Sequence, residues 1–365
     1  MDPTTRSATP DRTLDVDAMS VTTDLASGQP HAVAGGRPVL VIGEALVDAV
    51  TSPATEGGAA ESDTVEHVGG SPANVAFGIS ALEHEVDLAT WVGADERGSR
   101  IQERCNEVGV RLVDGSAGAD HTSLAHAHLD TTGAATYDFD ITWQVPPLPQ
   151  LGRYVHVHTG SIAATLEPGG TQVVEAVRAA RATATISYDP NMRPSLMGSP
   201  EAVRARVEEL VGLSDLVKAS DEDIAWLYPG RYVPDVLRLW GTLGAVVTVV
   251  TRGGEGALLA VPGSGEVTTV PARATVVADT VGAGDSFMAG LVSGLLDAGL
   301  LGGPDGRDRL RSATLADLRP AIDRAVTTGG ITVARAGAYA PTRSELHRLP
   351  RAETPSTRRY AGWSR

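Results

Sequence analysis

The sequence has little cysteine, little lysine and no long apolar run. One cysteine, Cys105, in 365 residues excludes an internal disulfide framework and any multi-cysteine metal site, which suits a reducing cytoplasm. The longest apolar runs, on either side of Thr248, are far too short to cross a bilayer, so no membrane partner is expected. Residues 1–37 lack the apolar core of a signal peptide and are expected to be a disordered leader.

Basic residues are also scarce relative to acidic ones. The net charge of -15 argues against nucleic acid as the main partner, because phosphate binding needs clustered cations. Arginines gather in residues 343–365, where a solvated polar tail is favoured over an anionic docking segment. Between leader and tail, residues 38–342 have the length of one large domain.

Short runs rich in valine and isoleucine alternate with segments of helical periodicity. This alternation predicts an α/β fold with a central, mostly parallel sheet flanked by helices. The expected strands are 39–43, 86–92, 154–158, 183–188, 216–219 and 245–251. The expected helices are 73–82, 99–108, 172–181, 202–213, 233–243 and the segment that follows Gly284.

Two regions, about 44–68 and 121–142, interrupt this pattern. Apolar and polar residues tend to alternate in pieces such as TSLAHAHL and AATYDFDI, as in antiparallel strands with one exposed face. Two insertions into one α/β core predict a small β-sheet that lies over the strand ends, where such folds bind ligands. A lid is the expected role.

Several phosphate-binding designs are missing. A Walker A loop needs a glycine-flanked lysine followed by Ser or Thr, but the only lysine, Lys218, precedes Ala-Ser-Asp. The protein-kinase tripeptides HRD and DFG do not occur. The pair Gly282 and Gly284 lacks the third glycine of a dinucleotide fingerprint, which makes a hydride-transferring enzyme a poor fit.

What is present is a glycine-rich turn, Gly282-Ala283-Gly284, before an amphipathic helix that carries Asp285 in its first turn. Free amides and the helix dipole at such a turn can hold an oxyanion. Asp285 by itself has two interpretations. It can be an acid that stabilises the helix end, or a base that takes the proton of an attacking hydroxyl while the amides stabilise the transferred group.

The wider sequence resembles the ribokinase-like, PfkB-type carbohydrate kinases, nearest their bacterial fructokinase branch. DTVGAGDSFMAGL (279–291) is similar to the C-terminal signature and VGGSPANVA (68–76) to the N-terminal one. VIGEALVD (41–48), YDPNMR (188–193), KASDED (218–223) and VVTRGGEGALL (249–259) agree in order, so the resemblance covers about residues 38–342. It implies a ribokinase-like fold with a small β-sheet lid.

The resemblance also implies site residues. The catalytic set would be Asp285 as base and the amides of Gly282, Ala283 and Gly284. The sugar would contact Asp48, Gly69, Gly70, Asn74 and Arg193, with Asp48 accepting from two hydroxyls. The nucleotide would contact Lys218, Ser220, Thr251, Gly253 and Gly256.

Metal ligands are less complete. Ser220 and Asp223 take the positions of the family's commoner Asn-x-x-Glu with shorter side chains, so Asp223 is expected to meet Mg²⁺ through water. Asp279 resembles a residue that helps to hold a monovalent cation such as K⁺. Whether Lys218 is required as a compact ammonium or survives by chance in an arginine-rich chain stays open.

The implied activity is ATP-dependent phosphorylation of a sugar primary hydroxyl, with fructose as first choice. Another sugar of the family, such as 2-keto-3-deoxygluconate, ribose or a nucleoside, is the alternative within the class. A sugar-binding sensor with the kinase fold but no turnover is the alternative from another class. The expected partners are the sugar, ATP and a second copy of the chain bound through the lid, in the cytoplasm.

Overall fold

The computed structural model describes residues 36–51, 64–129, 135–148, 150–273 and 275–348. All of them belong to one unit, Ala32–Arg365; the other unit, Met1–His31, lies outside the described residues. The expected leader therefore lies outside them except for residues 36 and 37, and so do residues 349–365 of the expected tail.

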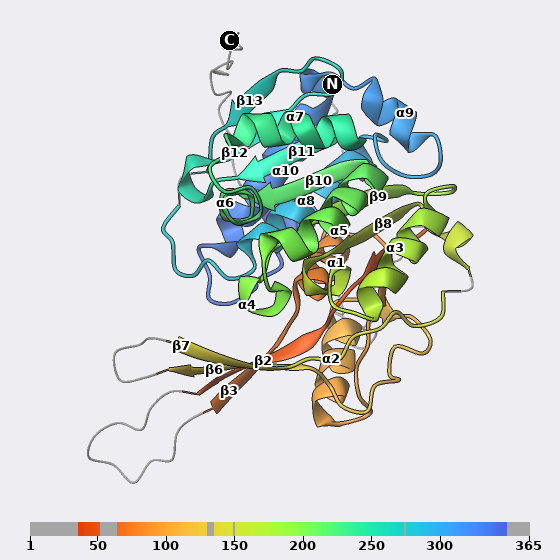
Figure 1. The fold of residues 1–365 in the computed structure, drawn as a ribbon, viewed down its shortest axis with the longest axis vertical. Coiled ribbons are helices and arrows are strands. Elements are labelled where there is room, and N and C mark those ends of the chain that lie inside the picture. The colour runs from red at the N-terminus through yellow and green to blue at the C-terminus, as the bar shows by residue number, and fades with distance from the viewer. Residues whose placement is uncertain (1–35, 52–63, 130–134, 149, 274, 349–365) are drawn as a thin grey trace, which may run out of the picture. The chain divides into compact units, whose positions relative to one another are not determined.

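A nine-stranded sheet forms the centre of the described unit, in the order β13-β12-β11-β10-β9-β8-β1-β4-β5 (Figure 1). Its strands from β11 to β5 are parallel, while β12 and β13 add an antiparallel edge, which confirms the predicted fold class. All six predicted strands occur; β5, β12 and β13 were not predicted. The bounds are β1 Val39–Ile42, β4 Val86–Ala89, β5 Val110–Leu112, β8 His156–Gly160, β9 Thr185–Asp189, β10 Leu216–Ser220, β11 Val247–Thr251, β12 Ala257–Ala260 and β13 Val267–Val270.

Helices cover both faces of this sheet (Figure 1). Residues of α1, α2, α8 and α10 share one core cluster with the strands, and residues of α3, α5, α6 and α7 share the other. Burial on both faces explains the continuous apolar run of β1, VLVI. The bounds are α1 Ser71–Ala81, α2 Glu96–Glu107, α3 Gly169–Ala180, α4 Pro194–Met197, α5 Pro200–Leu213, α6 Asp221–Leu227, α7 Val233–Leu243, α8 Ala283–Asp297, α9 Gly306–Arg311, α10 Leu315–Thr332 and α11 Arg343–Arg348.

The six predicted helices correspond to α1, α2, α3, α5, α7 and α8. Within the described ranges, none of the helices has both the length and the apolar character needed to cross a membrane.

The two interrupting regions form a separate four-stranded sheet in the order β3-β2-β6-β7 (Figure 1). Its strands are β2 Leu46–Thr51, β3 Thr64–Gly69, β6 Leu124–Leu129 and β7 Ala135–Asp140. The expectation of antiparallel pairing is wrong for the central pair, because β2 and β6 run parallel. Strand β2 follows β1, and β6 follows β5; β1 and β5 are parallel strands of the large sheet. Both β2 and β6 therefore leave the carboxyl edge of the large sheet in the same direction.

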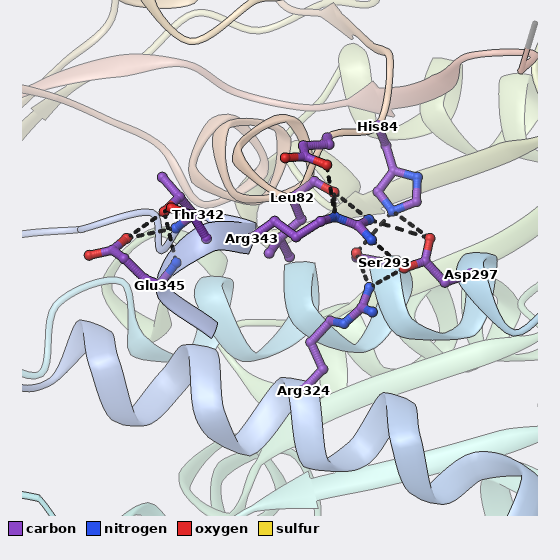
Figure 2. Close-up of polar contacts among 10 residues, drawn as sticks. Leu82, His84, Ser293, Asp297, Arg324, Thr342, Arg343 and Glu345 are labelled. Carbon is purple, nitrogen blue, oxygen red and sulfur yellow. Dashed lines mark hydrogen bonds and ion pairs between the residues drawn. The ribbon is translucent and has the colours of Figure 1, made fainter. Parts of the chain in front are cut away.

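The expected solvated tail is wrong at its start, because residues 343–348 form helix α11. Figure 2 shows Arg343 of α11 reaching the end of α1 and the end of α8. Its guanidinium donates to the carbonyl of Leu82 at 2.7 Å and to Asp297 Oδ2 at 2.9 Å. The carbonyl of Leu82 and a shared carboxylate therefore anchor a segment whose composition alone indicated a solvated tail.

Candidate active site

The glycine-rich turn adopts a conformation that requires its first glycine. Gly282 precedes α8 with φ 72°, and a Cβ at this position would lie 2.6 Å from the Cβ of Ala338. The Ala283 N–H donates to the carbonyl of Thr280 at 3.3 Å. Its amide is therefore not free, contrary to the prediction. Among the described residues, no acceptor takes the N–H groups of Gly282 and Gly284, which leaves these two for an anion.

Asp285 stands in the first turn of α8 and is 7% exposed. Two side chains of α1 donate to its carboxylate. Ser71 Oγ lies 2.7 Å from Oδ1, and Asn74 Nδ2 lies 2.9 Å from Oδ2. Asn74, predicted as a sugar contact, is therefore also a partner of the predicted base. The Ser71 contact was not predicted, since it joins residues more than two hundred positions apart.

The predicted sugar-side residues lie around the start of the small sheet. Gly69 of β3 faces Asp48 of β2 so closely that a Cβ there would collide with Oδ2. Gly70 has φ 99°, and its Cβ would lie 2.5 Å from the carbonyl oxygen of Glu44. Both glycines are thus required by close backbone and carboxylate approaches.

Electrostatics connect Asp48 to the remaining sugar-side residue. Asp48 is open to solvent, as a ligand contact must be, yet nearby protein displaces enough water to raise the pKa of its carboxyl. The positive charge of Arg193 opposes this rise, whereas the negative charge of Asp285 adds to it. The structure therefore places Asp48 within electrostatic range of both Arg193 and Asp285.

Lys218 lies beneath the glycine-rich turn. It is 3% exposed, and its Nζ would lie 3.1 Å from a Cβ on Gly284. Nζ forms an ion pair with Asp189 Oδ2 at 2.6 Å, although the two groups lack the alignment of a hydrogen bond. Burial acts to lower the pKa of Lys218, but Asp189 and Asp285 outweigh it and the pKa is raised, so the ammonium stays charged.

The Ser220 and Asp223 pair forms a capping box at the start of α6. Ser220 Oγ accepts from the Asp223 N–H at 3.0 Å. In return, Asp223 Oδ2 accepts from the Ser220 N–H at 2.8 Å, and Oδ1 accepts from the Met192 N–H at 2.7 Å. The helix cap is what the structure shows for these residues; their metal and nucleotide roles stay predictions.

The predicted nucleotide contacts Thr251, Gly253 and Gly256 line one cavity of about 480 Å³, together with Ala283 and Gly284. Sequence reasoning missed most of its lining, which comes from the segment before the turn and from α10. These residues include Ala272, Arg273, Val277, Thr280, Val326 and Gly330. The cavity therefore opens onto the same turn that exposes the free amides.

Asp279 connects two loops beside the turn. Its Oδ1 accepts from the Val281 N–H at 3.0 Å and its Oδ2 from the Gly337 N–H at 2.7 Å. These backbone donors hold the pKa of Asp279 below its usual value. The carboxylate is therefore ionised near the turn, where its predicted role beside a monovalent cation stays a prediction.

Residues 37–345 match the pfkB family carbohydrate kinase. The chain belongs to the pfkB family of carbohydrate kinases. Among curated relatives, a fructokinase of Klebsiella pneumoniae is 31% identical over 322 residues, which cover 85% of this chain and 98% of the relative. A fructokinase of Escherichia coli is 30% identical over 321 residues, with coverages of 84% and 97%.

Solved fructokinase structures agree on the fold. A fructokinase structure from Xylella fastidiosa gives a TM-score of 0.74 at 24% identity and covers 86% of this chain and 98% of that one. A fructokinase from Vibrio cholerae O395, in a fructose, ADP and calcium ion bound form, gives 0.66 at 25% identity, with coverages of 86% and 99%. The ribokinase-like architecture and the sugar kinase class predicted from sequence are confirmed.

Proposed function

We propose that this pfkB kinase transfers the γ-phosphate of ATP to a primary hydroxyl of fructose. The observation that carries the proposal is the position of Asp285. Its carboxylate is held by Ser71 and Asn74 of α1, on the side of the predicted sugar contacts. The helix that bears it starts at the free amides and the cavity of about 480 Å³ on the other side. The curated relatives named above are fructokinases, which supports fructose as the acceptor.

The proposed step is an in-line displacement. The sugar hydroxyl oxygen forms a bond to the γ-phosphorus, the bond from that phosphorus to the bridging oxygen breaks, and ADP leaves with the electron pair. Asp285 receives the hydroxyl proton. The amides of Gly282 and Gly284, with the ammonium of Lys218 beneath them, stabilise negative charge on the transferred group. Asp48, with Asn74, orients the sugar.

ATP requires a divalent cation, for which Mg²⁺ is proposed. No cluster of three or more histidine, cysteine or acidic side chains suited to a metal occurs in the described part of the chain. Mg²⁺ does not need such a cluster, because it is held largely by phosphates and water with one or two carboxylates. Asp223 retains lone pairs for a water-mediated contact after accepting its two backbone hydrogen bonds. The ion would neutralise charge on the phosphates.

The organisation around the site is proposed in the same terms. The kinase domain spans about residues 38–342 with α11 added, and the small sheet acts as a lid over the sugar. Its outer strands, β3 and β7, each have a neighbour on one side only within the described residues, an edge that a second copy of the chain can extend. A cytoplasmic homodimer formed through the lid is the corresponding proposal.

Release of ADP from Mg-ATP over a panel of sugars tests the function, with Asp285→Asn alongside. Loss of the base is expected to lower kcat by about two to four orders of magnitude while sugar binding persists. Asp317→Asn is a matched control, because Asp317 stands at the equivalent position in the first turn of α10 and lies in its own capping box. This control should keep full turnover.

Two other results would lead elsewhere. Turnover of 2-keto-3-deoxygluconate, ribose or a nucleoside in preference to fructose would keep the kinase and change the substrate. Sugar binding without turnover of any sugar would favour a sensor, and unchanged turnover in Asp285→Asn would remove the assigned base.

A further inference from the structure

The hydroxyl of Ser71 is used between two helices and not within its own. Ser71 is the first residue of α1, whose N-cap, Gly70, has no side chain to cap the helix. The hydroxyl instead donates to Asp285 Oδ1 at 2.7 Å, and Ser71 itself is 7% exposed. A buried hydroxyl needs a partner, and here the partner is the carboxylate proposed as the base.

The two helices are packed so that this contact is fixed by their backbones. A Cβ on Gly78 of α1 would lie 2.6 Å from the Cβ of Ala289 of α8, so the helices cross closely one to two turns beyond the contact. At the far ends, Arg343 binds both the carbonyl of Leu82 after α1 and the carboxylate of Asp297 in α8 (Figure 2). The donor on α1 therefore has little freedom to move away from Asp285.

Ser71 and Asn74 divide the carboxylate between them. Ser71 takes Oδ1 and Asn74 takes Oδ2, so each oxygen accepts one side-chain hydrogen bond. An ionised carboxylate offers about four lone-pair sites, which leaves room to accept a further proton. Two fixed donors on separate oxygens define the plane of the group, whereas a single donor would leave it free to rotate about its bond to Cβ.

We propose that Ser71 is a positioning residue for the phosphoryl transfer, which rests on the proposed function of Asp285. Its hydroxyl holds the carboxylate plane so that a free lone pair faces the sugar hydroxyl. Ser71 keeps its own proton throughout. The sugar O–H proton passes to Asp285, the O–P bond forms at γ-phosphorus, and the bridging O–P bond breaks toward ADP.

The first experiment compares Ser71→Ala with Ser80→Ala in the full chain. Ser80 lies on the same helix and its hydroxyl also bonds outside it, to the carbonyl of Val108 at 2.6 Å. Ser71→Ala is expected to lower kcat about ten-fold or more, as for loss of a hydrogen bond to a charged group, with little change in the KM values. Ser80→Ala should keep kcat. Equal kcat values in the two variants would overturn the proposal.

A second pair separates the hydroxyl from the shape of the side chain. Ser71→Thr and Ser71→Val have nearly the same volume, but only threonine keeps the donor. Ser71→Thr should have a kcat close to that of the parent, and Ser71→Val a much lower one. The two variants should bind the sugar with equal affinity in calorimetry. If both variants have the same kcat, or if they differ in sugar affinity alone, Ser71 has no positioning role.

A third comparison places Ser71→Ala in the Asp285→Asn background. A residue that acts through the base should change the residual turnover of Asp285→Asn by less than about two-fold. A full additional loss would show that Ser71 acts independently of Asp285 and would overturn the proposal. If Asp285→Asn itself retains turnover, the assignment of Asp285 as the base is wrong. If Asp285→Asn is inactive but Ser71→Ala is fully active, the base assignment stands and only the role of Ser71 is wrong.

Discussion

Gly69 leaves the space that the carboxylate of Asp48 occupies. The two residues lie on adjacent antiparallel strands of the small sheet, and a methyl group on Gly69 would collide with Asp48 Oδ2. Asp48 can therefore adopt this position only beside a glycine. In the glycine pair of the N-terminal signature, Gly69 is thus required by the Asp48 side chain beside it, and Gly70 by its left-handed backbone.

Gly69→Ala is expected to impair sugar binding selectively. Because the methyl group displaces the Asp48 carboxylate, the KM for the sugar should rise about ten-fold or more, as for loss of charged hydrogen bonds. The KM for ATP should stay unchanged, since the nucleotide cavity lies elsewhere. Gly241→Ala is the control, because nothing lies within 4 Å of its Cβ position and α7 tolerates alanine. An unaltered sugar KM in Gly69→Ala would contradict the role of Asp48.

Substitutions of Lys218 test whether the only lysine of the chain is required for turnover. Its pocket beneath Gly284 is closed and contains Asp189, so the larger planar guanidinium of Lys218→Arg does not fit without displacing the turn. Lys218→Met leaves the buried carboxylate of Asp189 without its cation. Both variants should lose about a hundred-fold in kcat, the effect of removing one charge-stabilising group. Steady-state kinetics at neutral pH measure this, and full activity of Lys218→Arg would make the lysine a matter of chance.

A monovalent cation beside Asp279 predicts a dependence on the salt used. Turnover should be higher in potassium chloride than in the same concentration of tetramethylammonium chloride, whose bulky ion cannot enter a site formed by carbonyl oxygens. Asp279→Asn should reduce that difference. The variant keeps one acceptor oxygen, so it can accept from the Val281 amide or from the Gly337 amide but not from both in their present positions. Equal rates in both salts would remove the cation site.

The large sheet and its main helices could be predicted because each carries its own period of apolar residues. The edge strands β12 and β13 were not predicted, because they follow β11 antiparallel and without an intervening α-helix, outside the alternation of strands and helices. The small sheet was recognisable from its alternation, but the parallel pairing of β2 and β6 depends on where both strands leave the large sheet. The start of α11 was misread because its stability comes from Leu82 and Asp297, far away in the sequence.

The candidate site was predictable wherever a motif carries the residue. The turn before Asp285, the glycines beside Asp48 and the cavity residue Thr251 are of this kind. The structure places the turn and Thr251 around one cavity, and Gly69 against the Asp48 carboxylate. The contact of Ser71 with Asp285 could not be predicted, because it requires the crossing of α1 and α8. The cap formed by Ser220 and Asp223 had a readable signal, the capping-box spacing.

The lowered pKa of Glu345 in α11 predicts that the stability of the fold depends on pH in the acid range. Burial alone would raise the pKa of Glu345, but the backbone N–H and hydroxyl of Thr342, the hydroxyl of Tyr339 and Arg335 hold it at about 2. Because the folded pKa lies below the ordinary value of 4.5, the ionised form stabilises the fold at neutral pH. This contribution is lost as the pH falls from 4.5 toward 2.

Glu345→Gln should therefore lower the free energy of unfolding by roughly 1–3 kcal/mol at pH 7, and the difference from the parent should narrow below pH 4.5. Urea unfolding at pH 7, 4.5 and 3 measures it. Glu175→Gln on α3 is the control, since Glu175 is exposed and has no hydrogen bond or ion pair among the described residues. A difference that stays constant over this pH range would show that Glu345 stabilises the chain by its shape and not by its charge.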